Sequence, residues 1–583
     1  MIRRYYATKD NTITNAFKEN LQTRATGSNM GASDILETFS IYNQVSNSSG
    51  ISSELARILI EFDTDQISAD RTAKLVPSSG SVSWFLKMYN TPHSQTTPTN
   101  FSLIVSAVSA SWQEGFGMDM DFYKDETKDQ TGSNWINAQK RTAATATIVA
   151  ATPGSLSNAA TFTLTNAGGT TTTYRINGGG SYDTQTGGTA GNTIDLFVGG
   201  ASSVAHIAEA VRKAINATTN ADMTATDDET NVTVTQSTVG ITGNKTNTDN
   251  STGLGSVGSF TGAVGEWASA GGDYVAESTK TQTFSTGFED LEVDVTKIVE
   301  RWLGNDWTNY GFGVKLTTAL EQAQRSYYRK KFYGRDSEFF FQKPVLEARW
   351  NSARKDDRGY FYASSSLVPP SDNLNTLYLY NRVRGRLRDY PIAPTSASIR
   401  VSTHIDTEIT SAPVYKLADT TGIYFANIAV ETTASTVRDV WYSGSVGYHT
   451  GTVAVKTFAA LGYNPEDTYV LSMPSLRKEY RKSQTHRLNL YVRQKNWSPN
   501  IYTQAVRASI PSLIIPSASY QLRRSIDDLK VVPYGTASST MHTQLSYDVS
   551  GNYFDLDTTY LEAGYLYDIQ YSFYDEENGW EEQ

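Results

Sequence analysis

The stretch from residue 284 to residue 350 has the pattern of the second half of a β-sandwich. Residues 291–295 (Leu-Glu-Val-Asp-Val) alternate apolar and acidic side chains, and 310–316 and 344–350 are also strand-like. Such alternation is typical of half-buried antiparallel strands. The matching first half lies near residues 5–140, so we expect one domain to be inserted within another.

The composition changes between the two halves. From 141 to 266 the chain is rich in Thr, Gly, Ala and Asn, with short alternating runs at 160–165 and 231–235. One stretch has apolar residues at helical spacing, with Ser202 or Ser203 as its N-cap. Its apolar face consists of Val204, Ile207, Ala208, Val211 and Ile215. We therefore predict a small α+β insert over residues 141–266.

The rest of the 583-residue chain is long enough for further domains, at ~150 residues each. Residues 1–140 and 267–350 are predicted to form one split β-sandwich. Residues 351–395 are interpreted as a connector, followed by two β-sandwiches over 396–485 and 486–583. The predicted fold class is mainly β: a multidomain chain of jelly-roll or immunoglobulin-like sandwiches with the α+β insert in its first domain.

Composition narrows the possible functions. The chain has no cysteine, which excludes disulfides, thiolate metal sites and cysteine nucleophiles. Its formal net charge of −10 disfavours nonspecific binding of nucleic acid. No run of ~18 apolar residues is present, so we expect no membrane-spanning helix, and no apolar secretory segment follows the first charges. The expected partners include neither nucleic acid nor membrane.

Catalytic motifs are not recognisable in the sequence. No two of the six histidines lie within four residues of each other, and no nucleophile elbow, phosphate loop or dinucleotide fingerprint appears. We therefore predict no enzyme and name no catalytic, cofactor-binding or metal-binding residue. Asp356 and Asp357, followed by Arg358 and Gly359, are expected to form a turn with a local ion pair.

One acidic run leaves a weak possibility of structural calcium. Its side chains, Asp119, Asp121, Asp125 and Asp129, could bind calcium through oxygen ligands. The run lacks the sixth-position glycine and twelfth-position glutamate of a calcium loop. We expect a solvated loop, with a calcium site as the alternative, and no other cofactor.

Basic and aromatic residues form the remaining local biases. One basic group lies within 325–335, and in another Arg382, Arg384, Arg386 and Arg388 are spaced to project from one face of an extended segment. A solvated or protein-contacting face is the simpler interpretation than a phosphate site. The 35 tyrosines are interpreted as sheet-face residues or as surfaces that stack on sugars or anchor partners.

The split first domain resembles the DNRLRE-type β-sandwich family, which is associated with surface and carbohydrate-binding proteins. The matching segments cover residues 5–140 and 267–350; they are 7–13, 57–63, 111–115, 134–137, 293–296, 309–312 and 331–333, together with Trp302. The insert at 141–266 departs from the family pattern.

The rest of the chain resembles virion structural proteins of marine, cyanophage-like tailed phages. The segments that carry this resemblance are 344–350, 355–359, 372–378, 496–499, 527–529, 532–536 and 545–556. It implies a particle component and no catalytic residues.

These resemblances imply a non-enzymatic structural component of a tailed phage virion, at the neck, baseplate or tail periphery or decorating the capsid. Its expected partners are other virion proteins and further copies in a symmetric homo-oligomer, and its place is the virion, assembled in the host cytoplasm. The alternative is a carbohydrate-binding adhesin that contacts a glycan on the host surface. A polysaccharide-degrading enzyme would need carboxylates facing each other across a cleft, and the sequence nominates no such pair.

Overall fold

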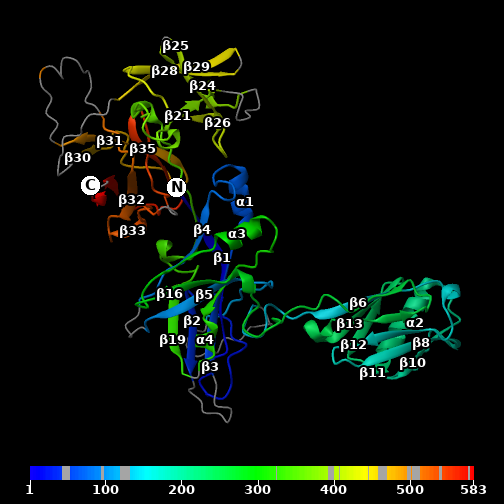
Figure 1. Cartoon of the computed structure of the whole chain (residues 1–583). Coiled ribbons are helices and arrows are strands. Elements are labelled where there is room, and N and C mark those ends of the chain that lie inside the picture. Colours follow the sequence, from blue (N-terminus) through cyan, green and yellow to red (C-terminus); the bar gives the residue numbers. More distant parts are fainter. Residues whose placement is uncertain are drawn as a thin grey trace.

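The structure is a computed structural model of residues 1–583. It describes residues 1–42, 53–92, 98–118, 132–323, 325–390, 400–405, 407–443, 445–456, 469–495, 501, 512–537, 541–575 and 578–583. The chain is mainly β, with several sheets packed in pairs and few helices (Figure 1), which confirms the predicted fold class of a multidomain β-sandwich chain.

The first sandwich is built from both sides of the insert, by residues 1–118, 132–140 and 267–350. Its elements are β1 (Ile2–Thr14), β2 (Ile35–Tyr42), β3 (Ser53–Phe62), α1 (Thr64–Thr72), β4 (Ser83–Met88), β5 (Phe101–Ala107), β16 (Lys280–Phe284), β17 (Leu291–Asp294), α3 (Thr296–Leu303), β18 (Phe312–Leu316), α4 (Thr318–Glu321), β19 (Tyr327–Tyr333) and β20 (Val345–Arg349). The strands predicted at 291–295, 310–316 and 344–350 therefore form. They close one core with strands that precede the insert.

The long strand β1 belongs to both sheets of the first sandwich. Ile2–Tyr6 pair with β20, which continues to β4 and β17. From Ala7 onward β1 pairs with β3, which continues to β18, β5 and β16. The register shifts between Ala7 and Lys9, where the strand passes from one sheet to the other. Such a bulge bends a strand and re-aims its side chains.

The insert (residues 141–266) has its own core. Its elements are β6 (Ala143–Val149), β7 (Thr161–Thr165), β8 (Thr171–Ser181), β9 (Gly188–Thr189), β10 (Thr193–Gly199), α2 (Val204–Asn216), β11 (Thr218–Thr219), β12 (Met223–Asp227), β13 (Asn231–Val239), β14 (Thr248–Asn250) and β15 (Ser256–Val257). The predicted helix is confirmed, and Ser203 is its N-cap. Figure 1 shows the insert beside the first sandwich, joined to it by a narrow connection.

The base of the insert is fixed by tryptophans. Trp112, Trp135 and Trp267 belong to one small apolar cluster on the first sandwich. The indole nitrogen of Trp267 donates to the Asn134 carbonyl at 2.8 Å, so the chain segments that enter and leave the insert are bound to each other.

The middle sandwich (residues 357–456) begins earlier than predicted. Its elements are β21 (Asn375–Tyr380), β22 (Arg382–Val383), β23 (Arg386–Leu387), β24 (Arg400–Ile405), β25 (Thr407–Pro413), β26 (Tyr415–Lys416), β27 (Ile423–Ile428), β28 (Thr436–Ser443) and β29 (Val446–Ala454). Phe361, Leu377 and Leu379 lie in the same core as Trp441. The strand expected at 377–380, within the stretch interpreted as a connector, forms as β21 and lies in this core.

The C-terminal sandwich (residues 469–583) also begins before its predicted boundary at 486. Its strands are β30 (Tyr469–Ser472), β31 (Thr485–Gln494), β32 (Ala518–Arg524), β33 (Leu529–Val532), β34 (Ser546–Asp548), β35 (Gly551–Asp557), β36 (Tyr567–Asp575) and β37 (Gly579–Glu582). β30 pairs with β31 and so belongs to this unit. Its core also takes in Ile2 and Phe341 from the first sandwich.

Candidate functional site

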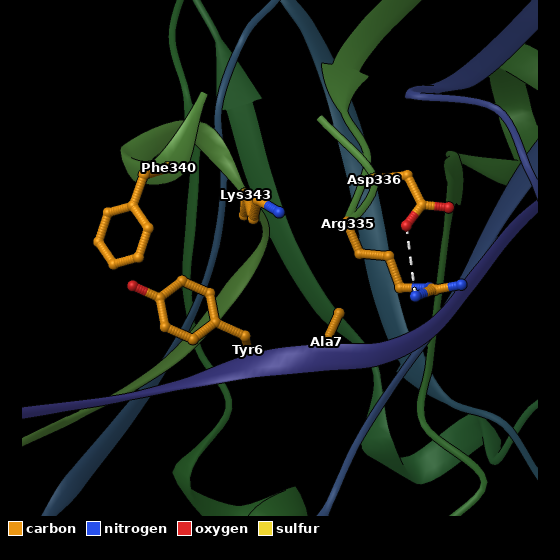
Figure 2. Close-up of a pocket in the computed structure, with 6 residues that line it drawn as sticks. All are labelled: Tyr6, Ala7, Arg335, Asp336, Phe340 and Lys343. Atoms are coloured by element: carbon orange, nitrogen blue, oxygen red, sulfur yellow. Dashed lines mark ion pairs between the residues drawn. The ribbon is translucent and has the colours of Figure 1, made fainter. Parts of the chain in front are cut away.

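A pocket lies where β1 changes sheets. It has a volume of about 350 Å³, and its lining side chains are Tyr6, Ala7, Arg335, Asp336, Phe340 and Lys343 (Figure 2). The rings of Tyr6 and Phe340 are 5.6 Å apart at one end. Charged side chains occupy the rest, so the pocket joins an aromatic wall to a polar one.

Most charged side chains of the polar wall already pair with other protein groups. Arg335 donates to both oxygens of Glu114, at 2.7 and 3.0 Å, and lies 3.3 Å from a carboxylate oxygen of Asp336. Behind it, Asp10 is buried and accepts the backbone N–H of Arg335 at 2.6 Å. Burial raises the pKa of Asp10 to about 7, the Arg335 amide opposes this, and nearby Glu114 adds to it. Within the described residues Lys343 has no ion pair, so it is the cation this pocket can offer a ligand.

The chemistry available in the pocket is binding. Stacking on Tyr6 and Phe340 and one charge-assisted hydrogen bond from Lys343 could hold a small ring or a partner's side chain. The six lining residues include no serine, cysteine or histidine.

A buried charged network joins the first and C-terminal sandwiches. Glu347 accepts from Arg4 and from Arg349, each at 2.6 Å, and Arg4 also donates to the Val531 carbonyl at 2.6 Å. Burial opposes ionisation of Glu347, but Arg4, Lys87 and Arg349 outweigh it and hold its pKa well below its usual range. Such a cluster is tolerated only when its charges are paired and hydrogen-bonded. We call the contact between the first and C-terminal sandwiches, with this network at its centre, the junction.

Aromatic side chains form a second candidate surface, on the sheet β21-β27-β26 of the middle sandwich. Tyr378 faces Phe425 across one strand pair, and Tyr415 faces Phe425 across the next. The alternation at 377–380 indicated the strand, but the sequence contains no signal that pairs Tyr378 with Phe425.

The acidic run Asp119–Asp129 lies outside the described residues, so the calcium prediction stays a prediction. In the described part of the chain, no group of three or more His, Asp or Glu side chains is placed to hold a metal ion. Asp356 caps a turn at Asp357–Gly359, and Arg358 lies 3.7 Å from Asp356, as expected. Asp357 also accepts from the Tyr547 hydroxyl at 2.6 Å, which links the middle and C-terminal sandwiches.

The two basic segments differ from each other. Arg382 to Arg388 do not form one extended face, because Arg384 and Gly385 adopt positive φ and fold the segment into a tight hairpin. Of the 325–335 group, Arg329 pairs with Glu37, and Lys330 is buried with three oxygen acceptors. Burial lowers the pKa of Lys330 to about 8. Lys330 therefore lies inside the first sandwich, whereas Arg329 pairs with Glu37 at its surface.

Comparison with known proteins identifies no family for this chain. No family model and no curated protein matches the chain. Two crystal structures of Salmonella alpha-2-macroglobulin, one reacted with methylamine and one of a mutant, align at 11% and 10% identity. They cover 42% and 54% of this chain and 16% and 18% of theirs, each with a TM-score of 0.11. The chain thus spans less than a fifth of those proteins. Among the described residues, none of the helices is both long enough and apolar enough for a membrane crossing.

Proposed function

We propose that the chain is a non-enzymatic structural component of a tailed phage virion, at the neck, baseplate or tail periphery or on the capsid. The observation that supports this proposal is the junction between the first and C-terminal sandwiches. Ile2 and Phe341 of the first sandwich are part of the C-terminal core, and Arg3 lies 3.5 Å from Asp557 of that sandwich. Burying both charges and apolar side chains between domains favours a fixed orientation, and repeated interfaces in a symmetric particle need fixed orientations.

Exposed apolar side chains supply candidate contacts to other virion proteins or further copies. Ile526 and Leu566 are 76% and 71% exposed, and the Ser525 amide donates to the Leu566 carbonyl at 3.0 Å. The two side chains therefore share one tip of the C-terminal sandwich. Leu367 in the middle sandwich is 92% exposed. Large apolar groups held at a surface gain free energy when a partner covers them.

Imaging of the intact particle at side-chain resolution tests this proposal. We expect the chain in symmetric contact with portal, tail or capsid proteins, with the Ile526–Leu566 tip covered. Absence of the chain from the particle, or density only as a flexible distal projection, would overturn it.

The insert is proposed to be an exposed appendage rather than an assembly interface, because insertions are best tolerated at loop tips. Replacing residues 141–266 with a short Gly-Ser linker should leave particle assembly intact. Loss of assembly with the first sandwich still folded would assign the insert an interface role instead.

The alternative function is a carbohydrate-binding adhesin that contacts a host-surface glycan. The aromatic side chains on β21, β26 and β27 favour it, because partly exposed rings in a row can stack on sugars.

A further inference from the structure

A row of four aromatic rings crosses one sheet of the middle sandwich. The rings of Tyr378 and Phe425 are 6.0 Å apart, and those of Phe425 and Tyr415 are 5.7 Å apart. Their planes are tilted by only 35° and 34°. Tyr380 extends the row, stacked 6.4 Å from Tyr378 at 26°. The register places three of these side chains opposite one another on adjacent strands, so the sheet itself sets their spacing.

The row faces away from the core. On β21, Leu377 and Leu379 are buried, while Tyr378 and Tyr380 between them are only partly covered. Tyr415 is 41% exposed. The Tyr415 end of the row is therefore open to solvent, whereas Tyr380 at the other end hydrogen-bonds Tyr553 of the C-terminal sandwich.

The rim of the row is polar and balanced in charge. Thr376 donates to Asn427 at 2.9 Å one register step from the row, and Asn427 is exposed. Beside Tyr415, Lys416 pairs with Asp389 at 2.7 Å. These groups can exchange hydrogen bonds with hydroxyls at a ligand's edge.

Charged groups of both signs also lie near Tyr378. Burial raises the pKa of the Tyr378 phenol to about 12, and nearby Tyr380 adds to the rise. Arg354 lowers this pKa, whereas Asp356 and Asp357 raise it. At the solvent-exposed end of the row Lys416 is already paired with Asp389, so the charge pattern fits an uncharged ligand.

We propose that this row binds an uncharged polysaccharide of β-linked pyranoses whose hydroxyls are equatorial, as in a β-1,4-glucan or chitin chain. The inference rests on the adhesin alternative and names its ligand class and its site. Such sugars present axial C–H bonds on their faces, and these bonds carry the partial positive charge that the negative face of an aromatic ring attracts. Their equatorial hydroxyls point sideways, toward the polar rim. The spacing of the rings is comparable to the length of one sugar unit, so successive rings can each carry one sugar.

A protein partner fits the row less well. The cores of protein interfaces are depleted of charged residues. This row instead has the partly exposed pair Lys416–Asp389 beside Tyr415. Close packing of a protein over the row would desolvate this pair.

The test is retention of the full-length chain on microcrystalline cellulose and on chitin, with affinities from depletion isotherms and from cellohexaose titrations. The double variant Tyr378→Ala/Phe425→Ala should lose at least about tenfold in affinity, given the usual worth of aromatic stacking. Tyr415→Ala, at the most exposed ring, should lose less. Tyr378→Trp, which enlarges the stacking face, should retain or tighten binding. The matched control is Tyr327→Ala, an exposed stacked tyrosine on β19 of the first sandwich, which should bind as the parent does.

Three outcomes would overturn the inference: no retention on either polysaccharide, retention unchanged in a folded double variant, or preference for alginate over cellohexaose. Particle imaging that shows a protein packed over the row would do the same. A chain that binds cellohexaose yet is absent from the particle defeats only the virion proposal. A chain found in the particle that binds neither polysaccharide defeats only this inference.

Discussion

The junction and the insert are held together by opposite means. At the junction, the side chains of Arg4, Glu347 and Arg349 are buried beside each other, and the Arg4–Glu347 contact spans 343 residues of sequence. The insert relies on apolar packing, with one face of α2 buried against its strands. Its ion pairs, such as Lys213 with Glu209, lie near the surface. The comparison teaches that this chain uses costly buried charge where domains must meet in one orientation, and simple apolar burial where a domain stands by itself.

The largest effect is expected from Glu347→Gln at the junction. Removing this carboxylate leaves Arg4 and Arg349 buried without their counter-ion, which should cost about 3–5 kcal/mol of unfolding free energy. Urea denaturation followed by circular dichroism and tryptophan fluorescence measures it. Because the folded pKa of Glu347 lies below its unfolded value of about 4.5, its contribution is present above that pH and is lost below it.

The matched control for that variant is Glu277→Gln. Glu277 pairs with Arg301 at 3.3 Å on the surface of the same sandwich. Exposed pairs contribute about 0–1 kcal/mol, so this variant should unfold nearly as the parent does. Equal losses in the two variants would show that the junction charges do not hold the sandwiches together.

The next largest effect is expected from Leu196→Ala in the insert. Leu196 is completely buried in the insert core, so truncation should cost about 2–4 kcal/mol through lost burial and a residual cavity. We expect two thermal transitions by calorimetry, with only the insert's transition lowered. A shift of both transitions would mean that the insert does not fold as a separate unit.

Sequence reasoning succeeded where structure is decided locally. The helical period from Val204 to Ile215 and the Ser203 cap are visible within one short window, as is the alternation at 291–295. It failed where the structure depends on a strand that is distant in the sequence. Phe340 meets Tyr6 because β1 bends at its bulge, and Leu377 is a core residue because β27 pairs with its strand. Periodicity reports which face is buried but not which strand covers it. The same limit hid the pocket and the aromatic row.

A pH titration of stability sharpens the comparison further. The folded pKa of Asp10, about 7, lies above its ordinary value of 3.8. The folded state therefore binds this proton more tightly, and its stability should fall as pH rises from about 4 to about 7. In the insert, the aspartates with shifted pKa values, Asp183 and Asp228, are exposed and are held low by hydrogen bonds. The insert's transition should accordingly move little between pH 5 and 8.

The variant for that experiment is Asp10→Asn. Its amide oxygen can still accept the Arg335 N–H, while the buried charge is gone. At pH 8 the variant's first sandwich should be more stable than the parent's, and its urea midpoint should be nearly constant from pH 5 to pH 8. An unchanged pH dependence in the variant would assign the effect to another group.

The smallest effect is expected from Ser203→Ala at the start of α2. The Ser203 hydroxyl accepts the His206 amide, and losing an N-cap costs about 1 kcal/mol. Ser237→Ala is the control, since Ser237 is an exposed residue of β13 in the same insert. Calorimetry should show the loss in the insert's transition alone. Should the first sandwich respond as well, the tryptophans at the base of the insert must transmit the change. The insert would then not unfold independently of the first sandwich, and the proposal that it is a separate appendage would fail.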